Sequence, residues 1–290
     1  MQGKIKPNTF NQDKAFFPLS LLFVVFFSWV FGWFFPLLFT VIAYGGYLAA
    51  RKLLSIENAE WPTAAWVLVL ALGFSFWCIE HLPAKDYRPY AEGKSISEGM
   101  KSAEELGLEG PKFGYIYTLV NKESGENKEM TDKEYIAGKW WENESYEMNS
   151  DLTKQVKLKD GYEPPIHDFF IMDADGNDKT PELLSAAKAF MVITYDIEKT
   201  SDAPQSELVA LSTSAIESGA LWVGITASGY KQVNEFRHNH QLAFDFWNGD
   251  ATMLKTIIRS NPGLVYLENG VVVKKWHYND LPSKEELKSL

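Results

Sequence analysis

The sequence predicts an α-helical membrane part followed by a water-soluble α/β domain, with a small β unit between them. Three observations point to this fold class. Residues 15–50 contain no charged side chain, the last third of the chain alternates short apolar runs with helix-like stretches, and the negative charge lies after residue 83. We expect three parts: 1–83 in the membrane, 84–165 as a connecting segment with the small β unit, and 166–290 as the α/β domain.

The first 83 residues carry the apolar runs expected of membrane spans. Residues 15–50 are long enough for two short helices or one strongly tilted helix, since one span takes about 20 apolar residues. Gly32 and Pro36 flank Trp33 near the middle of this run and favour a helix break there. We expect spans at about 15–31, 33–50 and 61–82. Two and three spans both remain open. A secretory signal peptide is disfavoured, because its apolar core is only about 7–15 residues long.

Basic residues indicate how the chain is oriented in the membrane. Lys4, Lys6 and Lys14 precede the first span, and Arg51 and Lys52 follow the second. Cytoplasmic loops carry an excess of Lys and Arg, so three spans leave the C-terminal part outside the cytoplasm. With two spans the N-terminus changes sides and the C-terminal part stays outside. In a bacterium, this predicts an inner-membrane protein with its soluble domain in the periplasm.

The charge balance limits the partners of the soluble part. The protein has a net charge of −10, and after residue 83 there are 23 basic and 34 acidic residues. An acidic surface repels phosphate backbones, which argues against nucleic acid as a partner. The expected partners are the lipid bilayer and other membrane or periplasmic proteins.

Cysteine usage limits the chemistry. Cys78 is the only cysteine in the chain, and it lies within the third expected span. An internal disulfide, a CxxC redox centre, a Cys-based zinc site and a cysteine nucleophile in the soluble part are therefore excluded. We interpret Cys78 as a small apolar residue of a helix.

The connecting segment begins with an aromatic and basic cluster, Asp86-Tyr87-Arg88-Pro89-Tyr90, directly after the last span. Tyr and Arg side chains at this position are typical of anchors at the lipid headgroups. We expect this role for the cluster rather than a ligand site.

A β hairpin opens the small β unit. The β-prone runs 113–120 and 128–130 flank a turn signal at 123–126. Further strands are expected near 145–148 and 155–158. The Trp140-Trp141 pair is expected to pack across this sheet, with ligand binding as the alternative.

The α/β domain is predicted from apolar runs separated by helix-like stretches. These runs are 167–173, 189–196, 220–227, 243–249 and the terminal pair within 264–276. Continuous apolar strands are expected where both faces of a sheet are covered. Asn269-Gly270 is a preferred turn pair and predicts that the last two strands form a hairpin. The pattern predicts a central mixed sheet between layers of helices.

Several motifs resemble known families. NPGLVYLENGVV at 261–272 resembles the ending of thioredoxin-like domains, in which a cis-proline opens the strand before a terminal hairpin. DADGN at 173–177 resembles the early hairpin of the peroxiredoxin-like and TlpA-like branches, and this resemblance covers about residues 166–290. HLPAKDYRPY, PPIHDFFI and TMLKTIIRSNPGLVYLENGVVVKKWHYNDLP occur in this order. With these motifs the chain resembles a group of Bacteroidota membrane proteins that join DoxX-like helices to a thioredoxin-like domain.

The chain departs from these families at two places. In thioredoxins the CxxC follows the strand that is 190–195 here, but this chain continues Asp196-Ile197-Glu198-Lys199-Thr200-Ser201-Asp202. Without a thiolate there is no disulfide exchange, so the resemblance implies the fold and not the activity. The membrane part also offers three spans where DoxX-like domains usually have four.

The resemblance implies a candidate binding surface, because the cis-proline loop of thioredoxin-like proteins contacts substrates. A cis Asn261–Pro262 bond would leave an exposed backbone edge with which a peptide can pair. The alternative is that Pro262 only shapes the fold. The candidate binding residues are Tyr195, Asp196, Glu198, Lys199, Arg259, Asn261 and Pro262.

Two polar groups outside this surface were considered as metal sites. The oxygen-rich residues Asp173, Asp175, Asn177 and Asp178 fail the register of a calcium-binding EF-hand, so we expect a β-turn there. His238 and His240 are two residues apart on an expected helix and therefore face different directions. Together with His277 they could bind a metal ion only if the tertiary fold happened to bring all three side chains together.

We therefore expect a membrane-anchored, non-catalytic thioredoxin-like protein. It would act as a binding or scaffolding subunit on the periplasmic side of a bacterial inner membrane. The alternative is a DoxX-like redox-associated membrane protein working with quinone or an electron-transfer partner. A hydrolase or transferase lacks support, because no set of nucleophile, base and orienting residue stands out. We assign no catalytic residue, cofactor or metal ligand.

Overall fold

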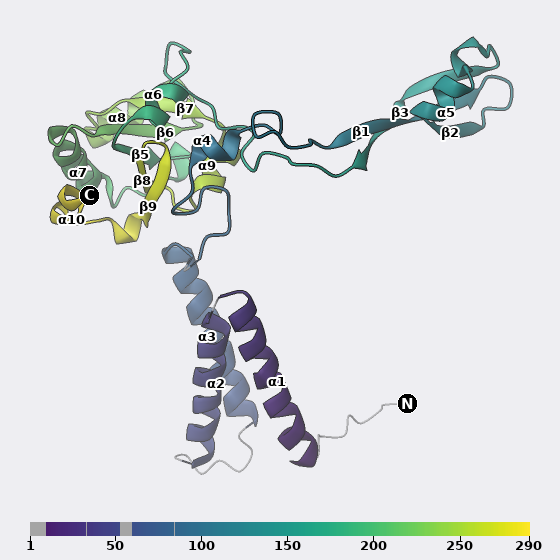
Figure 1. The fold of residues 1–290 in the computed structure, drawn as a ribbon. Helices are drawn as coiled ribbons and strands as arrows, with labels where there is room; N and C mark the ends of the chain where they lie inside the picture. Colours follow the sequence, from purple (N-terminus) through teal and green to yellow (C-terminus); the bar gives the residue numbers. More distant parts are fainter. Residues whose placement is uncertain (1–9, 33, 53–59, 84) are drawn as a thin grey trace. The chain divides into compact units, whose positions relative to one another are not determined.

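The computed structural model describes residues 10–32, 34–52, 60–83 and 85–290. The chain divides into two compact units, Met1–Glu80 and His81–Leu290. Among the described residues, the first unit is helical and the second contains the strands (Figure 1). The boundaries that we expect at residues 83 and 165 stay predictions.

Three helices form the first unit: α1 (Phe10–Val30), α2 (Phe35–Lys52) and α3 (Glu60–Glu80). The helical structure is interrupted between α1 and α2. There Gly32 adopts a left-handed φ of 59°, a conformation that glycine accepts readily. Trp33, the aromatic residue expected at this break, lies outside the described residues. Helices α2 and α3 approach closely, because a Cβ on Gly46 would lie 2.2 Å from the Trp66 ring.

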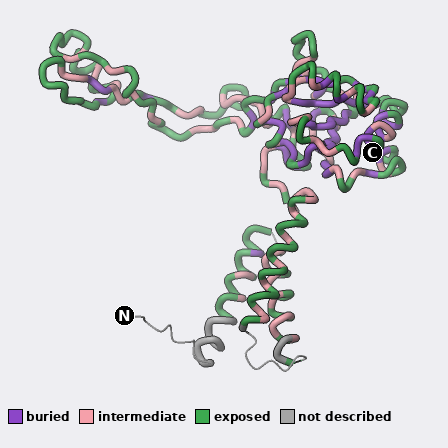
Figure 2. Tube along the Cα trace, turned by 180° about the vertical axis from the view of Figure 1, so that it is seen from behind, coloured by how far each residue is buried: buried purple, intermediate pink, exposed green. Residues whose placement is uncertain are grey.

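The described residues of these helices are mostly exposed (Figure 2), and many of them are large and apolar, such as Leu22, Trp61 and Phe76. The stretch Trp61–Glu80 of α3 has 20 residues and a mean hydropathy of 1.8, with no part of it buried. A helix of this length spans about 30 Å, the thickness of the hydrocarbon core of a bilayer. Within the described ranges, α3 is the one helix long and apolar enough to cross a membrane. The apolar stretches Pro18–Val30 and Phe35–Ala49 are shorter.

The cluster Asp86-Tyr87-Arg88-Pro89-Tyr90 is partly built into the second unit. Tyr90 is only 2% exposed and packs against Phe169, with ring centroids 6.0 Å apart. Tyr90 is therefore a core residue, and our expectation that it anchors at lipid headgroups is wrong. Burial of its ring in the apolar core explains the difference, whereas Tyr87 is 62% exposed.

A separate three-stranded sheet has the order β2-β1-β3. It contains β1 (Lys112–Asn121), β2 (Asn127–Thr131) and β3 (Tyr146–Lys159), with α5 (Asp132–Ala137) and the 3₁₀ turn η1 (Trp140–Glu142) between β2 and β3. The hairpin of β1 and β2 confirms the turn signal at 123–126. The two short strands expected near 145–148 and 155–158 are wrong, because one 14-residue strand pairs with β1 along its length and has a register shift in the middle.

The tryptophan pair of this small sheet is divided between two environments. Trp140 packs edge-on against Tyr146 at 5.3 Å, and the ammonium group of Lys128 lies 4.2 Å from the Trp140 ring centroid. Trp141 lies 5.9 Å from Tyr135 and stays 54% exposed. The expected packing across the sheet is confirmed for Trp140.

The main sheet has six strands in the order β4-β7-β6-β5-β8-β9. The strands are β4 (Ile171–Met172), β5 (Ala189–Ile193), β6 (Leu221–Thr226), β7 (Phe246–Gly249), β8 (Gly263–Glu268) and β9 (Val271–His277). Strands β5, β6 and β7 are mutually parallel, whereas β4, β8 and β9 pair antiparallel with their neighbours. The predicted mixed sheet is confirmed.

Helices cover both faces of this sheet, as the alternation along β5 shows. Ala189, Met191 and Ile193 enter one core cluster, and Phe190 and Val192 enter the other. Residues of α6 (Thr180–Ser185) and α9 (Ala251–Ile257) contribute to the first cluster, with Ile96 of α4 (Ile96–Met100). Residues of α7 (Gln205–Glu217), α8 (Tyr230–His240) and α10 (Lys284–Ser289) contribute to the second. The continuous apolar strands therefore have the two-sided burial that their pattern predicts.

Two strands, the edge strand β4 and its neighbour β7, are shorter than expected. The run 167–173 forms only the two-residue strand β4, and the run 243–249 forms only β7. Phe169 and Phe244 are buried without being part of a strand. An apolar run indicates which residues are buried, but it does not indicate which of them form the backbone hydrogen bonds of a strand. This explains both differences.

The terminal hairpin turns at Asn269 and Gly270, as predicted. Both residues have a left-handed φ, of 47° and 75° respectively. A Cβ on Gly270 would lie 3.0 Å from the carbonyl oxygen of Leu184, which also favours glycine. The peptide bond before Pro262 is cis. A parallel β-α-β unit, a terminal hairpin after a cis-proline and helices on both faces make this domain thioredoxin-like.

Candidate binding site

The carboxyl end of β5 is where the topology places a site. From β5 the chain crosses to β6 on one side and later returns to β8 on the other side. In open α/β sheets, ligands bind at the carboxyl ends of strands where the strand order reverses in this way. Thr194 and Tyr195 directly follow β5, so the residues from Tyr195 onward form the candidate site.

The turn after β5 occupies the position at which thioredoxins carry their cysteine pair. It contains the 3₁₀ turn η2 (Ile197–Lys199), and the ammonium group of Lys199 lies 2.7 Å from the carboxylate of Asp196. The hydroxyl of Thr200 donates to the carbonyl oxygen of Asp196 at 2.8 Å. The side-chain amide of Gln232 donates to Glu198 at 2.6 Å, which joins the turn to α8. The turn contains no cysteine, and these contacts hold its conformation.

Asn261 fixes the turn against the cis-proline loop. Its side-chain amide donates to the carbonyl oxygen of Asp196 at 2.7 Å, and its side-chain oxygen accepts from Thr200 at 3.1 Å. Its backbone carbonyl accepts from the N–H of Ser201 at 3.0 Å. Asn261 is 9% exposed. We expect an exposed backbone edge beside Pro262, and for the Asn261 carbonyl this expectation is wrong. The backbone N–H of Ser201 already donates to that carbonyl.

A groove lies beside this turn and is referred to below as the Tyr195 groove. Its volume is about 400 Å³, and it is lined by Arg88, Tyr195, Thr252, Lys255, Thr256, Ile258 and Arg259. The ammonium group of Lys255 lies 5.4 Å from the centroid of the Tyr195 ring, a cation–π arrangement. Among the described residues that line the groove, three are cationic and none carries a carboxylate.

One wall of the groove is held by a buried ion-pair network. The carboxylate of Asp86 bonds the guanidinium of Arg88 at 2.8 Å and also the ammonium group of Lys275, whose side chain is 4% exposed. Burial by itself raises the pKa of Asp86, but the hydrogen bonds from Arg88 and Lys275 outweigh it and hold that pKa well below its usual range. Burial lowers the pKa of Lys275, and Asp86 opposes this shift. Asp86 thus remains ionised and orients Arg88.

The structure brings the sequence-predicted binding residues together at this end of the sheet. Tyr195 and Arg259 line the groove, and Asp196, Lys199 and Asn261 belong to the hydrogen-bonded turn. Pro262 is buried, and Glu198 is exposed while bonded to Gln232. The sequence reasoning missed Arg88, Thr252 and Lys255. The sequence signal that could have identified Lys255 is its position four residues before Arg259.

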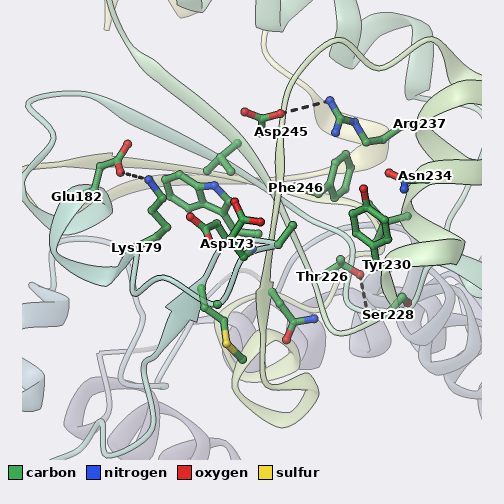
Figure 3. Close-up of a pocket in the computed structure, with 18 of the residues that line it drawn as sticks. Asp173, Lys179, Glu182, Thr226, Ser228, Tyr230, Asn234, Arg237, Asp245 and Phe246 are labelled. Carbon is green, nitrogen blue, oxygen red and sulfur yellow. Dashed lines mark hydrogen bonds and ion pairs between the residues drawn. The ribbon is translucent and has the colours of Figure 1, made fainter.

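A larger pocket, the Trp247 pocket, lies at the β4 edge of the sheet (Figure 3). It measures about 700 Å³, with walls formed by Trp247, Phe246 and Tyr230. Its two cations are each paired, because Lys179 lies 2.7 Å from Glu182 and Arg237 lies 3.4 Å from Asp245. Asp173 and Asp175 also line the pocket, so its acidic residues outnumber its basic ones. The pocket therefore offers aromatic surface, and both of its cations are already paired with carboxylates. No sequence motif predicted it.

The two groups considered as metal sites have other roles. The Asp173 carboxylate accepts from the backbone N–H groups of Asp175 and Asn177 at 3.0 and 2.9 Å, within the expected turn at Gly176. His240 lies 3.2 Å from Asp202, and His277 accepts from the backbone N–H of Asn279. In the part of the chain that the structure describes, no group of three His, Cys, Asp or Glu is placed to hold a metal ion.

Fold and site together define a class: a thioredoxin-like domain whose dithiol position carries a cysteine-free, hydrogen-bonded turn. Among solved structures, the exposed lipoprotein thioredoxin of Streptococcus pneumoniae is 17% identical, with a TM-score of 0.33, over 42% of this chain and 99% of its own. StoA of Bacillus subtilis is 14% identical, with a TM-score of 0.33, over 42% and 93%. The thioredoxin domain of a thiol-disulfide oxidoreductase from Bacteroides vulgatus is 11% identical, with a TM-score of 0.33, over 42% and 89%.

No protein-family model matches the sequence, and no curated protein matches it significantly. The fold assignment therefore rests on features of this chain: the strand order, the cis-proline before β8 and the core on both faces of the sheet.

Proposed function

We propose that this protein is a membrane-anchored, non-catalytic thioredoxin-like binding or scaffolding subunit. The observation that carries the proposal is the turn after β5, which has no thiol and is tied to Asn261 by three hydrogen bonds. A surface fixed in this way has the shape needed for recognition, but it lacks the nucleophile needed for disulfide exchange.

The apolar N-terminal helices support the membrane anchor. The α3 stretch Trp61–Glu80 has the length and composition of a span, and Leu72 and Phe76 are 61% and 65% exposed. Contiguous exposed apolar surface of this kind is unstable in water and requires lipid or a partner. The basic residues near the start of α1 and at the end of α2 favour the cytoplasm for those ends. With three spans, this orientation supports the proposal of a periplasmic thioredoxin-like domain at a bacterial inner membrane.

The partner in this proposal is another membrane or periplasmic protein that contacts the carboxyl end of β5. Exposed polar residues there offer contacts without requiring unfolding: the side chain of Lys199 is 79% exposed, and Glu198 and Arg259 are also exposed. The buried Asn261 and Pro262 support this surface from beneath.

Affinity purification of the full chain from detergent-solubilised native membranes tests the proposal. The comparison is between the wild type, the double variant Tyr195→Ala/Lys199→Glu and the control Lys188→Glu, which lies at the opposite end of β5. A defined protein partner should be retained by the wild type and the control and lost from the double variant. Equal recovery with all three would contradict the proposal. Bound quinone or haem without a protein partner would favour the DoxX-like redox alternative.

A further inference from the structure

The Tyr195 groove concentrates positive charge in an acidic protein. Its lining contains Arg88, Lys255 and Arg259, whereas the protein as a whole has a net charge of −10. Lys255 and Arg259 are exposed and have no ion-pair partner among the residues that the structure describes. The Trp247 pocket differs, because its cations Lys179 and Arg237 are each paired with a carboxylate. The groove therefore has positive charge available for a ligand.

The third cation, Arg88, is held in position before any ligand arrives. Asp86 bonds Nε of Arg88 at 2.8 Å and Nη2 at 3.0 Å, and Nη1 of Arg88 donates to the carbonyl oxygen of Lys255 at 3.2 Å. The Asp86 carboxylate also serves Lys275, so two cations share one negative charge. Two carboxylates of this region are thus already occupied, Asp86 by this network and Asp196 by Lys199. An arginine oriented in this way loses little conformational entropy on binding an oxyanion.

Neutral groups in the groove complete the recognition chemistry. Tyr195 offers an aromatic face beneath Lys255, and Thr252 and Tyr195 offer hydroxyl groups. Guanidinium and ammonium groups with hydroxyl donors are the set that binds tetrahedral phosphate oxygens. A volume of about 400 Å³ lies in the range of small-ligand pockets and accepts a phosphate ester.

We infer that the Tyr195 groove is a binding site for a phosphate-bearing ligand, held by Arg88, Lys255 and Arg259. The inference rests on the proposed function, since it names a ligand for the same non-catalytic surface. The phosphate comes from a soluble ester or from a lipid headgroup. The second source is within reach, because only seven residues separate Glu80, the end of α3, from Arg88, and the eight steps between these two residues extend over at most about 28 Å.

Binding of phosphate probes to the full chain in dodecyl maltoside, a detergent without phosphate, tests this inference. Inorganic phosphate and glycerol 3-phosphate are titrated at low salt, and the dissociation constants are compared between the wild type and Lys255→Gln/Arg259→Gln. The control Lys188→Gln/Lys284→Gln removes the same charge from exposed positions outside the groove. Native mass spectrometry with phosphatidylglycerol added to the detergent-solubilised protein forms the lipid arm.

We expect the dissociation constant of the groove variant for phosphate probes to rise by about tenfold or more, because the variant loses charge-assisted hydrogen bonds. The control should bind the probes as the wild type does. Rising salt should weaken wild-type binding. Loss of phosphatidylglycerol adducts in the groove variant alone identifies the lipid source, and loss confined to the soluble probes identifies a free ester. Absence of wild-type binding to any probe, or equal binding by the wild type and the groove variant, overturns the inference. Partner recovery in the affinity purification remains a separate readout, so the proposed function can stand when the phosphate site fails.

Discussion

The side-chain amide of Asn261 donates a 2.7 Å hydrogen bond to the backbone carbonyl of Asp196, although the two residues are 65 positions apart in the chain. This contact joins the turn after β5 to the cis-proline loop before β8. It lies at the position where thioredoxins carry their cysteine pair, and it holds the two segments together.

Replacing Asn261 with alanine should loosen this turn. The variant removes the bond to Asp196 and the acceptor for Thr200, and a buried polar group left without its partner costs about 1–3 kcal/mol. Amide hydrogen exchange on the full chain in detergent should become faster across residues 196–201. Asn239→Ala, at an exposed position of α8, is the control and should leave exchange unchanged. Unchanged protection in Asn261→Ala would show that the turn does not depend on this side chain.

Acid should destabilise the domain through Asp86. Its pKa in the folded protein lies below the value of about 3.9 expected for the unfolded chain, so its stabilisation is complete above that pH. It is lost as the pH falls through the folded-state pKa. At neutral pH, Asp86→Asn leaves Lys275 buried with its charge uncompensated, which should cost about 3–5 kcal/mol.

Thermal melting of the full chain between pH 2 and pH 7 measures this effect. The melting temperature of the wild type should fall more steeply below pH 4 than that of Asp86→Asn, which starts lower at pH 7. Asp151→Asn, at an exposed position of β3, should follow the wild type. Parallel curves for the wild type and Asp86→Asn would argue against a stabilising role for the ionised carboxylate.

A charge in α3 should impair membrane insertion. Leu72 lies near the centre of Trp61–Glu80, where arginine costs about 2.5–3.5 kcal/mol in insertion experiments. An alkaline phosphatase fused after Leu290 is active only outside the cytoplasm, so its activity should fall at least several-fold in Leu72→Arg and persist in Leu72→Val. Full activity with arginine at this position would mean that α3 does not cross the bilayer.

Much of the main sheet was predictable because burial on both faces makes its central strands uniformly apolar. The runs at β5, β6 and β8 show this pattern, and Asn269-Gly270 marks the terminal turn by its left-handed backbone preference. The lengths of β4 and β7 were harder to predict. Phe169 and Phe244 are apolar because they fill the core, although neither belongs to a strand.

The candidate site was predictable only in outline. The resemblance to thioredoxin-like domains implied that Tyr195 and Arg259 lie at one surface, and the structure places both in one groove. Arg88 comes from a segment more than 100 residues earlier, and we had interpreted it as a headgroup anchor. Its contact with Asp86 and with the carbonyl of Lys255 depends on tertiary packing, which no local pattern encodes.

Site-specific photo-crosslinking in cells tests the central claim most directly, namely that the cysteine-free turn after β5 is a binding surface. A photo-reactive residue replaces Lys199, whose side chain is 79% exposed, or Lys188 at the opposite end of the same strand. We expect a discrete crosslinked partner from position 199 and none from position 188. The same crosslinks from both positions, or none from position 199, would contradict it.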